Sequence, residues 1–167
     1  MDNYILIGFM GSGKSTISKK LSYRMKMVMI DTDKVIEEKE GRTISDIFAK
    51  DGEETFRRME TELLEELVKS THKTILSVGG GTPLREENRT LLKQLGQVIY
   101  LEISADTVLE RLKGDQTRPL LQGSDARQKV ESLLNARKPI YEAAAQITVR
   151  VDGKSSDEVV EEVLASL

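Results

Sequence analysis

The stretch GFMGSGKST combines three glycines, a lysine and two hydroxyl side chains directly after the apolar run YILI. It satisfies the pattern G-x-x-x-x-G-K-[ST] at four positions: Gly8, Gly13, Lys14 and Ser15. Gly11 and Gly13 allow the backbone N–H groups to turn inward around a phosphate at the start of a helix. Lys14 can reach the β- and γ-phosphates, and the Ser15 hydroxyl suits Mg²⁺. A glycine-rich turn without a ligand explains neither the lysine nor the hydroxyl, so the stretch predicts a phosphate-binding loop.

Such a loop serves molecular switches, motors and small kinases. The guanine-reading motif N-K-x-D of small GTPase switches occurs nowhere in the chain. Motors and large ATPases are usually longer than 167 residues. The sequence therefore favours a small kinase, whose second substrate must be recognised by other motifs.

Two carboxylates follow the second apolar run in MVMIDTDKV. The ends of parallel strands are where open α/β sheets bind ligands, and residues two apart on a strand share a side. Asp31 could thus hold a water molecule of the Mg²⁺ shell. Asp33 could accept a hydrogen bond from an acceptor hydroxyl and take its proton. The alternative for Asp33 is capping of the helix that follows, and the sequence leaves both open.

Glu60 falls within an apolar helical stripe formed by Phe56, Met59, Leu63 and Leu67. An unpaired carboxylate there would be costly to bury. Arg57 precedes it by three residues, which is within reach on a helix. The pair is either a local ion pair or a device by which Glu60 fixes the Arg57 guanidinium for binding an anion.

Arg137 lies among apolar residues in VESLLNARKPIY, where Pro139 predicts an interruption or kink of the helix. A structural role would explain either this arginine or Arg57 alone. Two inward-facing arginines together suggest an anionic substrate other than the nucleotide. With Asp33, they predict a pocket for a carboxylate and hydroxyl groups.

Two further segments carry candidate residues. Three consecutive glycines, Gly79–Gly81, allow a ligand to approach the backbone closely and offer N–H donors, where a simple turn needs fewer. Arg118 lies in GDQTRPLLQGSD, a predicted mobile loop. A cation on a closing lid can stabilise a transferred phosphoryl group while water is excluded, and a solvated loop charge is the alternative.

The elements that must position these residues alternate between strand and helix. Short apolar runs predict strands at 4–9, 27–30, 74–78, 98–103 and 147–151. Helical patterns occupy 14–25, most of 33–70, 86–95, 105–113 and 126–144. A last helix opens with a capping box at Ser155 and Glu158 and is expected to bury Val159, Val160, Val163 and Leu167. This alternation predicts an α/β fold with a parallel sheet covered on both faces.

Composition limits the remaining possibilities. The 167 residues fit one domain, and 25 Lys and Arg against 28 Asp and Glu give a net charge of −3, which argues against a nucleic-acid partner. No cysteine is present, so disulfides and thiolate zinc sites are excluded, and the one histidine, His72, is expected in a solvated loop. No apolar run approaches the roughly 20 residues of a membrane span, and no signal-peptide pattern is seen. We expect a cytoplasmic protein with no membrane partner.

Taken together and in this order, the motifs GFMGSGKST, DTD, GRTISDIF, DGEETFRRMETE, VGGGTP, RPLL and ARKPIYEAAA resemble the shikimate kinase family, among the nucleoside-monophosphate-kinase-like P-loop kinases. The resemblance implies that ATP, with Mg²⁺, phosphorylates the 3-hydroxyl of shikimate in chorismate and aromatic amino acid biosynthesis. It also implies a single αβα domain over 1–167, with a five-stranded sheet in the order 2-3-1-4-5. A helical substrate-binding region would span about 33–61 and a mobile lid about 112–124, in a monomer.

The resemblance also implies roles for individual residues. Catalysis would rest on Lys14, Asp33 and Arg118. ATP would be bound by Gly11, Ser12, Gly13, Lys14, Ser15, Thr16, Arg111, Arg118 and Lys154, with Arg111 and the turn near Lys154 enclosing adenine. Shikimate would be bound by Asp33, Arg57, Gly79, Gly80 and Arg137, supported by Glu60. Mg²⁺ would be bound by Ser15, with Asp31 in its outer shell. The rival hypotheses are a gluconate or nucleotide kinase of the same fold and a nucleotide-binding regulator without kinase chemistry.

Overall fold

The computed structural model describes residues 2–113 and 125–167. Its sheet has five strands: β1 (Asn3–Gly8), β2 (Val28–Asp31), β3 (Thr74–Ser77), β4 (Gly96–Glu102) and β5 (Ile147–Arg150). All paired strands run parallel, in the order β2-β3-β1-β4-β5. The predicted sheet order is confirmed, and each strand begins and ends within two residues of its predicted limits.

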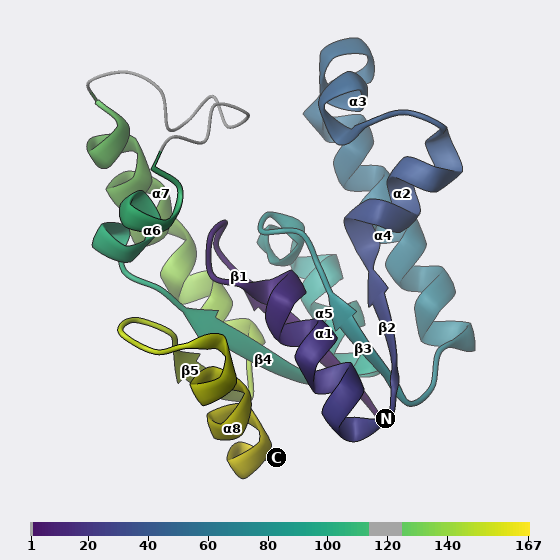
Figure 1. Ribbon diagram of the computed structural model, residues 1–167. Helices are drawn as coiled ribbons and strands as arrows, with labels where there is room; N and C mark the ends of the chain where they lie inside the picture. The colour runs from purple at the N-terminus through teal and green to yellow at the C-terminus, as the bar shows by residue number, and fades with distance from the viewer. Residues whose placement is uncertain (1, 114–124) are drawn as a thin grey trace.

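Helices cover both faces of the sheet (Figure 1). They are α1 (Lys14–Met25), α2 (Thr32–Glu40), α3 (Ile44–Asp51), α4 (Glu53–Ser70), α5 (Glu86–Leu95), α6 (Ala105–Arg111), α7 (Ala126–Ala144) and α8 (Ser156–Ser166), with a 3₁₀ turn, η1, at Thr82–Leu84. Helices α1 and α8 pack together on one face, and α5 and α7 lie on the other. The three-layer αβα architecture is therefore confirmed.

The central strand β1 explains why the sheet must be covered twice. Ile5, Leu6 and Ile7 are fully buried although their side chains alternate between the two faces. A sequence without polar alternation is stable in a strand only when helices exclude water from both sides. Because the carboxyl end of β1 continues directly into the phosphate loop, this buried strand fixes where the loop lies.

The long helical stretch predicted after residue 33 consists of three helices, α2, α3 and α4. A short break separates α2 from α3. Thr43 caps the start of α3, because its side chain accepts a hydrogen bond from the Asp46 N–H. The three helices are grouped on the side of the sheet that ends in β2 (Figure 1). The segment therefore forms a helical subregion at one side of the sheet.

Two local predictions are wrong. Helix α7 runs from Ala126 to Ala144 through Pro139 without the predicted interruption, and the alternative of a kink at this residue stays a prediction. A proline inside a helix costs about 3 kcal/mol, but burial of Leu134 before it and Tyr141 after it anchors both sides. Leu167 is 41% exposed, because α8 ends at Ser166 and the last residue lies beyond its buried stripe. The capping box of α8, from Ser155 and Glu158, is confirmed.

Some predictions concern residues that the structure does not describe. Helix α6 ends at Arg111, two residues before the predicted limit, and the segment 114–124 of the proposed lid lies outside the described residues. His72 is exposed, as predicted, and its Nδ1 lies 3.7 Å from Asp2 Oδ1. Across 2–113 and 125–167, no helix has the length and apolar character needed to cross a membrane.

Asn3 joins three segments at the amino end of the sheet. Its Nδ2 donates to the carbonyl oxygens of Thr71 at 3.0 Å and Leu95 at 2.9 Å, and its Oδ1 accepts from the Thr74 N–H at 3.0 Å. The residue is fully buried, so water cannot replace these bonds.

We expect Asn3→Ala to lower the free energy of unfolding by about 3 kcal/mol, because three buried backbone groups lose their partner. Urea denaturation measures the loss. Asn135→Ala, at an exposed position on α7, is the control and should change stability by less than about 0.5 kcal/mol. Equal effects of the two substitutions would contradict the role given to Asn3.

Candidate active site

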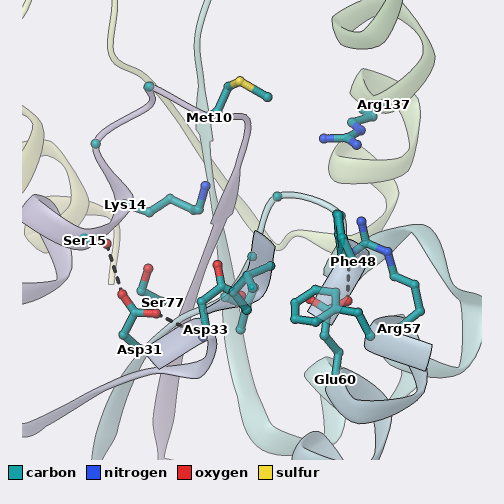
Figure 2. A pocket seen from close by; sticks show the side chains of 18 of the residues that line it. Met10, Lys14, Ser15, Asp31, Asp33, Phe48, Arg57, Glu60, Ser77 and Arg137 are labelled. Carbon is teal, nitrogen blue, oxygen red and sulfur yellow. Dashed lines mark hydrogen bonds and ion pairs between the residues drawn. The ribbon is translucent and has the colours of Figure 1, made fainter. Parts of the chain in front are cut away.

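A cavity of about 660 Å³ opens at the carboxyl ends of β1, β2 and β3. Its lining includes most of the charged residues singled out from the sequence: Lys14, Asp31, Asp33, Arg57, Glu60 and Arg137. Figure 2 shows Lys14 and Ser15 on one side, Arg57 and Arg137 on the other, and Asp33 between them. The arrangement places a phosphate loop opposite two guanidinium groups.

The phosphate loop has the backbone that its glycines predict. Gly11 and Gly13 have φ angles of 80° and 90°, in the left-handed region that favours glycine. Gly13 is the N-cap of α1, so the first N–H groups of this helix face the loop. Lys14 Nζ donates to the carbonyl oxygens of Gly8 at 2.7 Å and Phe9 at 3.3 Å, which holds its ammonium group at the mouth of the loop.

Two further loop residues, Ser12 and Thr16, differ in exposure. Ser12 is 1% exposed, and its Oγ has no hydrogen-bond partner among the described residues. Thr16 is exposed and lines the cavity. Both belong to the turn where backbone and side-chain donors surround a phosphate group in proteins with this motif.

Asp31 joins the phosphate loop to the second strand. Its Oδ2 accepts from Ser15 Oγ at 3.3 Å, and its Oδ1 accepts from the N–H groups of Asp33 and Lys34. Asp31 is thus the N-cap of α2, and the capping role considered for Asp33 belongs to Asp31 instead. The two carboxylates share the cavity because the chain turns into α2 at residue 32. Alternation of side chains along a strand predicts the same shared side. That explanation is wrong, because Asp33 lies on α2 and not on β2.

Asp33 faces the cavity from the first turn of α2. Its buried Oδ1 has no hydrogen-bond partner among the described residues. Burial, followed by the negative charges of Glu60 and Asp31, raises the pKa of Asp33 to about 6. A poorly solvated carboxylate with an unpaired oxygen is suited to accept a hydrogen bond from a substrate hydroxyl.

Arg57 and Glu60 form a partly buried ion pair on α4. Arg57 Nη1 donates to Glu60 Oε1 at 2.7 Å, and Glu53 Oε1 lies 3.3 Å from Arg57 Nη2. Burial alone would lower the pKa of Arg57, but the charges and hydrogen bonds of Glu60 and Glu53 together outweigh it and raise the pKa. The guanidinium is therefore permanently charged and held in one orientation at the cavity wall.

Arg137 reaches the cavity from α7 and lies 5.7 Å from the centre of the Phe9 ring. Among the described residues, no carboxylate forms an ion pair with it. Tyr141, one turn further along α7, donates from its hydroxyl to the Gly80 carbonyl at 2.6 Å. Burial raises the pKa of this tyrosine, so it remains a donor at neutral pH. The bond connects the helix that carries Arg137 to the glycine segment.

The three glycines lie where these side chains converge. A methyl group on Gly79 would lie 2.9 Å from Asp33 Oδ1 and 3.1 Å from Glu60 Oε2. On Gly80 it would lie 3.5 Å from Arg137 Nη1, and on Gly81 it would overlap the Arg57 guanidinium. The absence of a β-carbon at Gly79 and Gly81 therefore lets charged groups of α2 and α4 lie close to the end of β3, whereas Gly80 is in ordinary contact distance of Arg137 on α7.

A family comparison identifies the chain. A model of the family "Shikimate kinase" matches residues 10–167. The chain belongs to the shikimate kinase family. A shikimate kinase from Rhodococcus jostii is 44% identical over 163 residues, covering 98% of this chain and 96% of the relative. One from a Sulfurihydrogenibium species is 42% identical over 167 residues, covering 100% and 98%.

Solved structures agree with this assignment. The shikimate kinase from Acinetobacter baumannii, in complex with shikimate, has a TM-score of 0.91 and 36% sequence identity, and the match covers 99% of this chain and 92% of that one. The predicted family and fold are confirmed. ATP-dependent phosphorylation of shikimate, the activity expected from the sequence motifs, is confirmed at the level of the shikimate kinase family.

The residues expected near adenine lie outside the main cavity. Arg111 Nη1 donates to the Gly11 carbonyl at 2.9 Å, so the end of α6 rests on the phosphate loop. Lys154 pairs with Glu162, and its Nζ also donates to the Arg150 carbonyl. Arg111 and Lys154 line one shallow depression of about 560 Å³. Arg118 lies outside the described residues.

The sequence did not point to two other residues of the candidate site, Phe48 and Thr82. Phe48 lines the cavity although it is 41% exposed, and its ring packs edge-on against Phe56. Aromatic residues make up only 4% of the chain, so an aromatic in the helical stretch after residue 33 was an available signal. Thr82 carried no such signal, because its contact with Glu60 joins positions far apart in the sequence.

Asp33→Asn should change how stability depends on pH. The pKa of Asp33 is about 6 in the folded protein, above the value near 3.9 of an unfolded chain, so stability is lost as the pH rises through 6. Asparagine does not ionise. The variant should therefore gain about 2 kcal/mol in free energy of unfolding, relative to the unmodified protein, between about pH 4 and pH 8. Urea denaturation across this range tests it, and a difference independent of pH would contradict the raised pKa.

Proposed function

We propose that this chain transfers the γ-phosphoryl group of ATP to the 3-hydroxyl of shikimate within the cavity described above, giving shikimate 3-phosphate and ADP. The carrying observation is the placement of Arg57, Arg137 and Asp33 across the cavity from Lys14 and Ser15. Two cations and one hydrogen-bond acceptor match a small carboxylate with ring hydroxyls.

On the acceptor side, we assign the carboxylate of shikimate to Arg57 and Arg137. Their guanidinium groups approach Gly81 and Gly80 respectively, so the carboxylate would lie near the glycine segment. Gly79 and Gly80 contribute backbone groups, and Asp33 binds ring hydroxyls through its unpaired oxygen. The helices over about 33–61 form the substrate-binding region of a single domain spanning 1–167.

On the donor side, the phosphate loop from Gly11 to Thr16 surrounds the ATP phosphates. Ser15 and the outer-shell residue Asp31 would hold Mg²⁺, since an adjacent hydroxyl and carboxylate are the oxygen donors it prefers. When bound, Mg²⁺ offsets the negative charge of the β- and γ-phosphates. Adenine would lie in the depression between Arg111 and Lys154.

Transfer itself asks little covalent chemistry of the protein. Lys14 stabilises charge on the transferred group, and Arg118 on a lid spanning about 112–124 adds a second cation. With a pKa of about 6, Asp33 is mostly ionised at pH 7 and can take the proton of the hydroxyl that it orients. We further propose that the protein is a monomer and acts in the cytoplasm, where ATP is available.

A coupled assay of ADP release tests the acceptor. We expect turnover with shikimate and, with gluconate or nucleoside monophosphates, rates lower by at least about 100-fold. Nucleoside monophosphates lack the carboxylate, and gluconate has one but lacks the ring that fixes its hydroxyls relative to it. Lys14→Ala should reduce transfer by at least about 100-fold while the melting temperature stays within a few degrees. Absence of turnover with shikimate would refute the proposal. ATP hydrolysis that no acceptor stimulates would favour a nucleotide-binding regulator.

Arg57→Ala should weaken shikimate binding about 10- to 100-fold, since it removes a charge-assisted hydrogen bond, and leave ATP binding within about twofold. Glu60→Ala should reproduce part of this loss. Calorimetry measures both. If the double variant lost as much affinity as the two single variants combined, the coupling between Arg57 and Glu60 would be disproved.

A further inference from the structure

Glu60 is held from two sides, and the proposed binding role uses only one of them. Its side chain is 1% exposed. Oε1 accepts the hydrogen bond from Arg57, and Oε2 accepts a hydrogen bond from the hydroxyl of Thr82. A buried carboxylate needs donors for both oxygens, because water cannot supply the missing bond. The orientation of Glu60 therefore depends on Thr82 as well as on Arg57.

Thr82 is itself fixed in place. It is 1% exposed and begins η1, immediately after the three glycines. Its N–H donates to the Gly79 carbonyl at 3.1 Å, and its own carbonyl accepts from Asn88 Nδ2 at 2.9 Å. Asn88 is fully buried, and its Oδ1 accepts from the Thr61 hydroxyl at 2.7 Å. Thr82 thus has little freedom to move away from Glu60.

Little space surrounds Glu60 Oε2 on its other side. A methyl group on Gly79 would already lie 3.1 Å from this oxygen. A water molecule is therefore a poor replacement for the Thr82 hydroxyl, since it needs both room and several polar partners. Without the hydroxyl, Oε2 would have to turn toward another donor, and the nearest charged donor is the Arg57 guanidinium.

We propose that Thr82 is a positioning residue: its hydroxyl fixes the Glu60 carboxylate and, through it, orients Arg57 toward the carboxylate of the acceptor. The proposal rests on the proposed function, in which Arg57 binds that group. Thr82 does not contact the acceptor in this arrangement. Its removal should therefore affect binding of the acceptor carboxylate while leaving the phosphate loop unchanged.

The test compares Thr82→Val, which keeps the shape and removes the hydroxyl, with Thr82→Ser, which keeps the hydroxyl. We expect Thr82→Val to raise the Kd and KM for shikimate about tenfold, with the KM for ATP within about twofold, and Thr82→Ser to remain within about twofold for both. Thr74→Val is the matched control. Thr74 is also buried, and its hydroxyl donates to the His72 carbonyl at the opposite end of β3. It should lower stability without changing the KM for shikimate.

A second ligand separates this proposal from the proposed function. The acceptor analogue carries a carboxamide in place of the carboxylate, and the measured quantity is the ratio of its Kd to that of shikimate. This ratio should fall in both Arg57→Ala and Thr82→Val. A reduced ratio in Arg57→Ala alone would overturn the role of Thr82. An unchanged ratio in Arg57→Ala would refute the carboxylate-binding role of Arg57 itself.

Thr82→Ala covers the case in which valine prevents folding. It also removes the hydroxyl but adds no bulk, and circular dichroism and the melting temperature establish that it is folded. A normal ratio of carboxamide to carboxylate Kd in folded Thr82→Ala would overturn the proposal, and a reduced ratio would support it.

Discussion

The buried negative charge of Glu60 determines how the cavity wall that carries Arg57 is built. Glu60 lies in the apolar stripe of α4, where an unpaired carboxylate would destabilise the fold. Its two oxygens are satisfied by Arg57 and Thr82, so the same bonds that make its burial tolerable also hold a guanidinium at the cavity wall. Stability and the proposed binding role are coupled here, because Arg57, the cation that compensates the charge of Glu60, is also the group proposed to bind the acceptor carboxylate.

The glycine segment after β3 is the geometric counterpart of that charge. Side chains from α2 and α4 approach Gly79 and Gly81 so closely that a β-carbon would displace them, and Arg137 of α7 lies within ordinary contact distance of Gly80. The strand order explains why this happens at one place, because β3 lies between β2 and β1, next to the strand that leads into the phosphate loop. The phosphate loop and the glycine segment therefore lie at adjacent strand ends, as expected for ligand sites of open α/β sheets.

Charge is distributed unevenly around the cavity. The side nearest the phosphate loop combines Lys14 with Asp31 and Ser15, a set suited to phosphate and a divalent cation. The opposite side presents Arg57 and Arg137, and among the described residues only Arg57 is paired with carboxylates. Between them, Asp33 carries a raised pKa because it is poorly solvated and faces other acids. The cavity thus separates a side suited to phosphate and a divalent cation from a side suited to a carboxylate.

The sequence alone determined what depends on neighbouring residues. The phosphate loop was predictable because Gly11 and Gly13 must adopt positive φ within one short turn. The strands and their order, the ion pair of Arg57 with Glu60 and the capping box at Ser155 were likewise predictable, from periodicity, from spacings of three residues and from the family motifs. The resemblance carried by those motifs also gave the family, because they occur in the same order along most of the chain.

Only the tertiary structure decided what depends on distant residues. It buried Asp33 Oδ1 without a hydrogen-bond partner among the described residues, and it kept α7 helical through Pro139 by burying its flanks. It also placed Thr82 on Glu60, 22 residues away in the chain. Hydrogen bonds and packing across such separations are set by how helices dock on the sheet, and no local pattern of residue types encodes that docking.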